Sequence, residues 1–199
     1  MLQHRDDQAE VHKVVVGPLR TNVYVLRCTH TGRAVLIDAA DEPEALLGLA
    51  HRLGVERVLE THGHHDHIRA VPAMRAAGYP VGVAAADAPM VPGHDFEVAD
   101  GEVLEVGHLR LRALATPGHT PGSTSYLVEG SPLLFSGDTL FPGGPGATRS
   151  PEAFAAIVDS IDRLFAELGD ATTVLPGHGE PTAIGTERPH LPEWVERGW

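Results

Sequence analysis

The segment THGHHDH, residues 61–67, contains four histidines and one aspartate. Imidazole nitrogens and carboxylate oxygens bind divalent transition metals, so this density of both groups indicates a metal site. Residues two apart in an extended segment point the same way, so His62 and His64 can bind one ion from the same side. Where the chain turns into a helix, Asp66 and His67 can face a second ion. The segment therefore predicts two half-sites.

Three later segments carry further candidate ligands. They are TPGHTPG with His119, SGDTLF with Asp138 and LPGHGEP with His178. Each of these segments, like THGHHDH, follows a run of residues that predicts a β-strand. Loops at the carboxyl ends of strands are where α/β folds usually place ligand and metal sites. We therefore expect all four segments to meet at one edge of the fold.

Counting the possible ligands gives two sets that share one carboxylate. His62, His64, His119 and Asp138 would bind one ion, and Asp66, His67, His178 and the same Asp138 would bind the other. A carboxylate has two oxygens and can bridge two cations, which an imidazole cannot do. Nitrogen and oxygen ligands without thiolate suit Zn²⁺, Fe²⁺ or Mn²⁺.

The remaining histidines and the cysteine have plainer interpretations. We expect His65 to point away from its neighbours and to bind no metal. Cys28 is interpreted as a small packed side chain. The other histidines are interpreted as surface or hydrogen-bonded residues: His4, His12, His30, His51, His108 and His190.

Hydrophobic periodicity predicts the elements that position these residues. Helical spacing predicts helices over 42–54, 67–78 and 151–168, with strands before and between them. The proline-rich segment 88–94 predicts a loop. Two strand-rich halves, each with helices, predict an α/β fold of two packed sheets with helices outside, as a single domain over residues 1–199.

Composition limits the partners and the compartment. The formal charge of −12 opposes binding to nucleic acid or to anionic membranes, so we expect a small-molecule substrate. No apolar run reaches the roughly 18 residues that span a bilayer. The single cysteine excludes an internal disulfide, and the polar start of the chain is unlike a secretory signal, so we expect a cytoplasmic protein. The sequence leaves the oligomeric state open, and a homodimer is one of the alternatives.

In the type and order of these candidate ligands, the sequence resembles the metallo-β-lactamase superfamily. The HxHxDH signature of that superfamily matches residues 62–67, and His119, Asp138 and His178 match its later ligands in order. The resemblance implies an αββα sandwich of two mixed sheets with flanking helices. TPGHTPGS, GDTLF and LPGHG are most similar to glyoxalase II and its short bacterial relatives. True β-lactamases of the superfamily usually carry cysteine or serine where Asp138 stands, and are exported.

This resemblance implies a metal-dependent hydrolase that acts on a small thioester or related acyl compound. Two divalent ions, with zinc favoured and iron or manganese as alternatives, would supply hydroxide at neutral pH. Asp66 and Asp138 are the candidate catalytic residues, since Asp66 could orient the hydroxide. Arg149 is a candidate for contacting an anionic substrate group. Only some twenty residues follow LPGHG, where full-length glyoxalase II has a glutathione-binding helical domain, so glutathione use stays open.

Three alternatives keep the same fold. A persulfide dioxygenase would bind one iron through the residues matching His62, His119 and Asp138. A lactonase or another ester hydrolase would use the same two ions on a different bond. A protein that binds metal without catalysis would show no turnover of any acyl or persulfide substrate.

Overall fold

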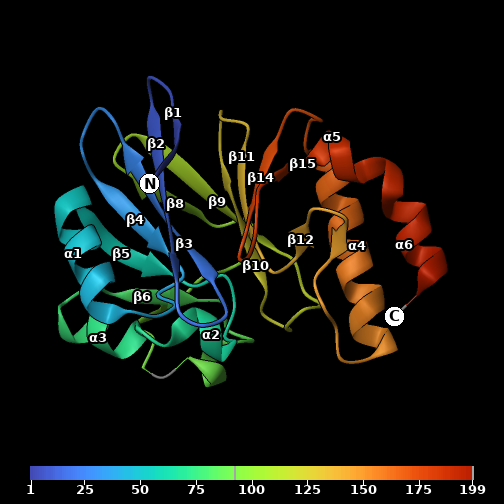
Figure 1. Ribbon diagram of the computed structural model, residues 1–199, viewed down its shortest axis with the longest axis horizontal. Helices are drawn as coiled ribbons and strands as arrows, with labels where there is room; N and C mark the ends of the chain where they lie inside the picture. The colour runs from blue at the N-terminus through green and yellow to red at the C-terminus, as the bar shows by residue number, and fades with distance from the viewer. Residues whose placement is uncertain (92, 199) are drawn as a thin grey trace.

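The computed structural model describes residues 1–91 and 93–198 and contains two β-sheets that pack face to face (Figure 1). The first sheet has seven strands, in the order β1-β2-β3-β4-β5-β6-β7. Their bounds are Leu2–Arg5, Ala9–Val16, Thr21–Cys28, Ala34–Ile37, Val55–Leu59, Val81–Val83 and Phe96–Glu97. The strands from β4 to β7 pair in parallel, and β1 to β4 pair antiparallel. The sheet is therefore mixed.

The second sheet has six strands, in the order β15-β14-β11-β10-β9-β8. In chain order β8 to β11, β14 and β15 are Val103–Val106, Leu109–Ala115, Thr124–Val128, Leu133–Gly137, Thr173–Pro176 and Thr182–Ala183. In this second sheet, the described strands β11 and β14 pair in parallel. A small separate hairpin pairs β12, Leu140–Phe141, with β13, Gly144–Pro145.

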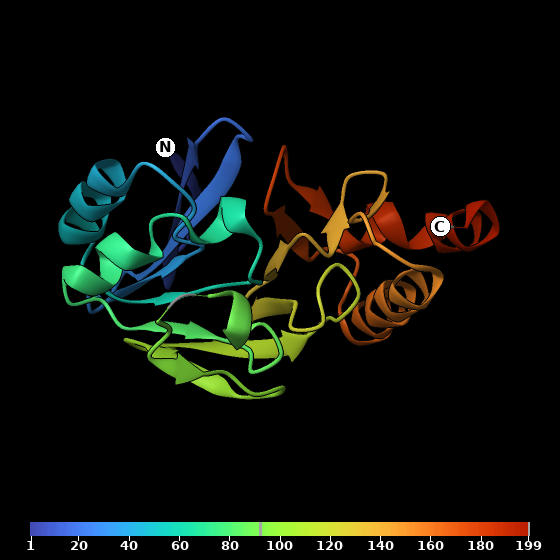
Figure 2. The ribbon, with the colours of Figure 1, turned by 90° about the horizontal axis from the view of Figure 1, so that it is seen from below.

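Helices cover the outer faces of both sheets (Figure 2). Apolar residues of α1 and α3 pack on the first sheet, and those of α4, α5 and α6 pack on the second. The helices α1 to α6 are Pro43–Leu53, His65–Ile68, Val71–Ala76, Pro151–Glu167, Ile184–Glu187 and Leu191–Arg197, and two 3₁₀ turns, η1 and η2, cover Ala88–Met90 and Arg188–His190. A third apolar cluster fills the space between the sheets. The predicted layers, helix–sheet–sheet–helix, are confirmed.

Local signals explain the two longest helices. Helix α1 begins with Pro43, whose missing N–H costs nothing in the first turn, and ends at Gly54 in the left-handed region with φ 74°. Helix α4 is capped by Ser150, whose hydroxyl oxygen accepts a hydrogen bond of 3.1 Å from the N–H of Ala153. Both helices occur where the hydrophobic period predicts them.

The predicted helix over 67–78 is wrong in its extent. The chain forms two short helices, α2 and α3, that meet at Arg69 and Ala70. Pro72 lies in the first turn of α3, where it lacks the N–H that would bond to the carbonyl of Ile68 and its ring clashes with that carbonyl, so α2 does not continue into α3. The N–H groups of Arg69 and Ala70 donate instead to Ala40 and Ala39 beside the first sheet. This break separates the helix that carries Asp66 and His67 from the helix that packs on the core.

Two smaller features differ from expectation or extend it. The mostly polar residues 2–5 form the edge strand β1, although they lack the β-branched pattern of a strand. The predicted loop over 88–94 contains η1, and Pro92 within it lies outside the described residues. Among the helices that the structure describes, none has the length and hydropathy needed to cross a bilayer.

Candidate metal centre

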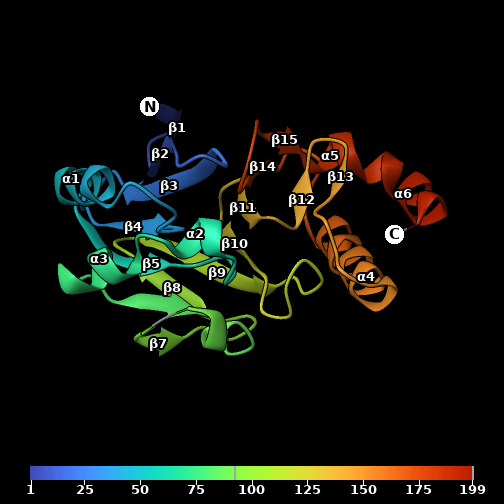
Figure 3. The same ribbon diagram turned by 60° about the horizontal axis from the view of Figure 1, so that its bottom comes forward.

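The four ligand-bearing segments meet at one edge of the sandwich, where α2 lies beside the loops that follow β5, β9, β11 and β14 (Figure 3). β5 belongs to the first sheet and the other three strands to the second. The site therefore lies between the two sheets, and both sheets supply ligands. The expectation that these segments converge is confirmed.

The first group consists of His62, His64 and His119. One nitrogen from each ring lies within 4.8 Å of the others, a spacing that can hold a metal ion. His64 Nδ1 and His119 Nε2 are 2.8 Å apart. His62 Nε2 is buried and has no hydrogen-bond partner among the described residues. A buried nitrogen without a partner is costly, so it fits a ring that faces a ligand.

The second group consists of Asp66 and His67 on α2 and His178 after β14. His178 Nε2 lies 3.2 Å from Asp66 Oδ2 and 3.2 Å from His67 Nε2. His67 is fully buried, and the side chains of Asp66 and His178 remain about one quarter exposed. Solvent therefore reaches this group from one side, where a substrate could approach.

Asp138 lies between the two groups. Its Oδ2 is 3.5 Å from His119 Nε2 and 3.6 Å from His178 Nε2, and its Oδ1 is 3.5 Å from His67 Nε2. Oδ1 is buried and has no hydrogen-bond partner in the described chain. These distances suit a carboxylate that bridges two ions, as the sequence predicts.

Two glycines provide the space around this carboxylate. A Cβ atom on Gly177 would lie 2.2 Å from Asp138 Oδ1 and 2.7 Å from His67 Cε1. A Cβ atom on Gly146 would lie 1.8 Å from the backbone oxygen of Asp138. Any larger residue at either position would displace the proposed bridging group.

Hydrogen bonds at the outer ring nitrogens fix four of the five imidazoles. The Nδ1 atoms of His119 and His178 lie 2.7 Å and 3.2 Å from the backbone oxygens of Ala147 and Leu19. His67 Nδ1 lies 2.8 Å from Asp38 Oδ2, and His62 Nδ1 lies 3.0 Å from the hydroxyl of Thr61. An outer partner that accepts the Nδ1 proton leaves Nε2 free to bind a metal. His64 differs, because its Nδ1 faces His119.

The predicted non-ligand His65 is exposed, and Arg149 is an exposed residue just before α4. The charge of Arg149 lies close enough to contribute to a lowered pKa at His64. This places Arg149 beside the ligand groups.

Electrostatics favour neutral imidazole at two residues of the first group, His62 and His64. Burial lowers the pKa of His62 well below its ordinary value, and the surrounding histidines lower it further. Burial likewise lowers the pKa of His64, and the charge of His119 adds to the effect. Neutral imidazole is the form that binds metal.

Negative charge dominates the second group. A hydrogen bond from His178 holds the pKa of Asp66 far below its ordinary value, so this carboxylate is ionised. Burial alone would lower the pKa of His67, but Asp38, Asp138 and Asp66 raise it to about 9. The carboxylates that hold a proton on His67 in the absence of metal would also stabilise a metal cation at this position.

Sequence reasoning missed two buried aspartates that support the ligands. Asp38 follows β4 and accepts hydrogen bonds from the backbone N–H and hydroxyl of Thr61, besides its contact with His67. Asp87 follows β6 and joins two ligand loops through the N–H groups of Gly63 and Gly122 and the hydroxyl of Thr120. Both lie after strands of the first sheet. Neither belongs to a cluster of possible ligands in the sequence, so only the hydrogen-bond donors that the fold brings to them reveal their role.

Loss of Asp87 should destabilise the protein. Asp87→Ala leaves the buried N–H groups of Gly63 and Gly122 without acceptors, and each costs about 1–3 kcal/mol, so we expect the free energy of unfolding to fall by at least about 2 kcal/mol. Urea denaturation of the metal-free protein measures this. Asp162→Ala, at an exposed position on α4, is the control and should change the value by less than about 0.5 kcal/mol. Equal stability of the two variants would contradict the role given to Asp87.

Comparison with known families agrees with this geometry. The family model described as the metallo-beta-lactamase superfamily matches residues 16–178, a range that contains all seven candidate ligands. The chain belongs to the metallo-β-lactamase superfamily. The sequence resemblance and the fold that it implies are thereby confirmed.

Individual members of the superfamily are similar over most of this chain. A hydroxyacylglutathione hydrolase of Rhodospirillum rubrum is 36% identical over 85% of this chain and 66% of its own length. A solved structure titled TTHA1623 in a di-iron-bound form is 31% identical, with a TM-score of 0.76 over 89% of this chain and 96% of the other. One titled BLEG-1 B3 metallo-beta-lactamase is 30% identical, with a TM-score of 0.79 over 92% and 98% of the two chains. The chain spans two thirds or less of the hydroxyacylglutathione hydrolases that it matches.

Proposed function

We propose that this protein is a binuclear metallo-hydrolase that cleaves a small thioester or a related acyl compound. The observation that carries the proposal is the position of Asp138, within 3.6 Å of ligand nitrogens from both groups. The buried Asp138 Oδ1 and His62 Nε2 atoms have no hydrogen-bond partner among the described residues, which supports a bound cation at this position. The similarity to hydroxyacylglutathione hydrolases supports thioesters as the substrate class.

Two divalent ions, of which we favour Zn²⁺ over Fe²⁺ or Mn²⁺, would supply hydroxide at neutral pH and a Lewis acid for the substrate carbonyl. His62, His64 and His119 would hold one ion, and Asp66, His67 and His178 the other, with Asp138 shared. Asp66 stays ionised and partly exposed, so it can accept a hydrogen bond from the attacking nucleophile and orient it. A thiolate leaves without strong acid assistance, so no further protein acid is required.

The partner that we propose is a small molecule. The formal charge of −12 opposes nucleic acid and anionic lipid, whereas bound cations would attract an anionic substrate locally. Cytoplasmic location is part of the same proposal, since the single cysteine and the thioester chemistry both suit a reducing compartment.

Elemental analysis and a substrate panel test the proposal together. Protein should be purified without a metal-binding tag from cells supplied with zinc and iron, and then assayed with thioesters, lactones, other esters and a β-lactam. At least two divalent ions per chain with thioester turnover would support the proposal. About one iron per chain with oxygen uptake on persulfides would replace it with the dioxygenase, and preferred turnover of lactones would change the substrate class.

Arg149 should assist binding of anionic substrates. Arg149→Gln removes a guanidinium that can pair with a carboxylate, so we expect KM for a carboxylate-bearing thioester to rise about tenfold, the effect of about 1.4 kcal/mol. The value of kcat should change little, because Arg149 is not among the ligand groups. A neutral thioester assayed with the same variant is the control. An equal rise in KM for both substrates would contradict charge recognition.

A further inference from the structure

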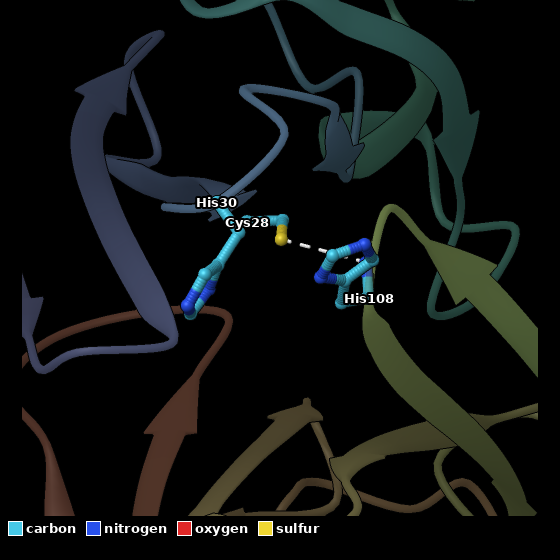
Figure 4. Close-up of side chains that lie close together, drawn as sticks. All are labelled: Cys28, His30 and His108. Carbon is cyan, nitrogen blue, oxygen red and sulfur yellow. Dashed lines mark hydrogen bonds between the residues drawn. The ribbon is translucent and has the colours of Figure 1, made fainter.

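A second cluster of metal-binding side chains lies outside the proposed centre and consists of Cys28, His30 and His108 (Figure 4). Cys28 is the last residue of β3, and His30 lies in the turn between β3 and β4. His108 lies in the turn between β8 and β9, in the other sheet. The three side chains therefore join one turn from each sheet.

This cluster and the metal centre lie at opposite ends of the same strands. β3 starts at Thr21, which forms a β-bridge with His178, and runs for eight residues to Cys28. At about 3.3 Å per residue, the strand separates the two sites by about 23 Å. β9 likewise runs from His108 toward the loop that holds His119. The cluster therefore cannot share an ion with the proposed centre.

The geometry is close to that of a bound ion. One ligand atom from each of the three residues lies within 4.8 Å of the others, and the two imidazole rings have centroids 5.7 Å apart. Tetrahedral zinc with these ligands needs separations of about 3.3–3.8 Å, given bonds of about 2.0–2.3 Å. Both histidines are exposed, so a shift of their rings by about 1 Å would close the difference, while the sulfur is buried and accepts the hydrogen bond from His108 drawn in Figure 4.

The surrounding residues prepare the cluster. The N–H of His108 donates to Cys28 Sγ at 3.4 Å, so the β8–β9 turn already touches the sulfur. A Cβ atom on Gly107 would lie 2.1 Å from the Thr31 hydroxyl and 3.1 Å from Cys28 Sγ, so glycine is required for this approach. The Thr29 hydroxyl donates to Asp7 and lies 3.4 Å from His30 Nδ1, which favours the His30 tautomer with Nε2 free.

We propose that Cys28, His30 and His108 bind one Zn²⁺ ion, with water as the fourth ligand, and that this ion links the two sheets at the end opposite the metallo-hydrolase centre. Thiolate and imidazole together select zinc over magnesium or calcium. The thiol ionises when zinc binds, and its proton passes to solvent. The role is structural and separate from the proposed activity.

The state of the thiol is compatible with this site. Burial raises the pKa of Cys28, but hydrogen bonds from the Thr31 side chain and from backbone N–H groups of the two turns outweigh it and lower the pKa to about 7.

Cobalt substitution tests the proposal without any activity assay. Co²⁺ bound to thiolate gives an intense near-ultraviolet charge-transfer band, and Cys28 is the single cysteine of the chain. The proposed centre has no thiolate and cannot give this band. Tag-free, metal-stripped protein titrated with Co²⁺ should develop the band to saturation at one ion per chain above those in the centre, and Zn²⁺ should remove it.

Variants decide whether all three residues take part. Cys28→Ser should abolish the band, and His30→Ala and His108→Ala should each weaken the underlying Co²⁺ binding at least tenfold. These histidines are exposed, so their variants should fold even if Cys28→Ser does not. His51→Ala, an exposed histidine on α1, is the control and should change nothing. Absence of the band at saturating Co²⁺, or an undiminished band in the double histidine variant, would overturn the proposal.

Discussion

Asp138→Ala should lower turnover of the acyl substrate by about 10³-fold and weaken retention of both metal ions. The carboxylate lies within 3.6 Å of nitrogens from His67, His119 and His178, so its loss removes one ligand from each proposed ion. Metal stabilisation of the transition state is worth several kcal/mol, and about 4 kcal/mol corresponds to this loss in rate. Steady-state kinetics and elemental analysis of the same preparation measure both effects.

The matched control for this variant is His65→Ala. His65 lies in the same motif but is exposed, and it is absent from the ligand groups of the centre. We expect its activity and metal content to stay within about twofold of the unmodified protein, because exposed substitutions away from special features change little. Full activity in the Asp138 variant would refute the assignment of the centre.

Asp38→Asn should weaken binding of the ion held by His67 by about 10–100-fold. Asp38 Oδ2 contacts both His67 Nδ1 and the Thr61 hydroxyl. It therefore orients the ligand His67 directly and the ligand His62 through Thr61. Asparagine keeps the side-chain size and tolerates the left-handed backbone at this residue, where φ is 65°. Competition with a chromophoric chelator measures the affinity. Excess metal should restore activity, whereas it should not restore the Asp138 variant.

The same substitution should change how the stability of the metal-free protein depends on pH. The pKa of His67 is about 9 in the folded protein, above its ordinary 6.5, with Asp38 as the largest cause of the rise. The charged ring therefore stabilises the fold fully below about pH 6.5, and this contribution is lost as the pH rises through 9. Asp38→Asn should remove this fall in stability. Urea denaturation of both metal-free proteins between these pH values measures the effect. A variant whose free energy of unfolding falls with pH as steeply as that of the unmodified protein would contradict the prediction.

Several features of the fold follow from short-range pattern alone. The amphipathic helices α1 and α4 have a strong 3.6-residue period, and Gly54 and Ser150 mark a helix end and a helix start. Features that depend on partners elsewhere escape the pattern. β1 is polar and exists because it pairs with β2, and the break between α2 and α3 is fixed by hydrogen bonds to Ala39 and Ala40.

The seven candidate ligands are visible in the sequence because metal chemistry restricts residue type strictly. Histidine and aspartate at strand ends, at the spacing of one extended segment and one helical turn, indicate which residues can reach an ion before any contact is known. Asp38 and Asp87 carry no such signal. A buried aspartate that accepts hydrogen bonds is recognised by its donors, and those donors come from segments 23–35 residues away.

The sequence by itself determined the family, the layered fold and the set of candidate ligands, because periodicity and residue chemistry act over a few neighbouring positions. Tertiary structure decided how the two sheets meet. That packing places Asp138 between the two ligand groups and brings His108 against Cys28 across eighty residues of chain. Such contacts depend on the register of distant strands, which no local pattern of residues encodes.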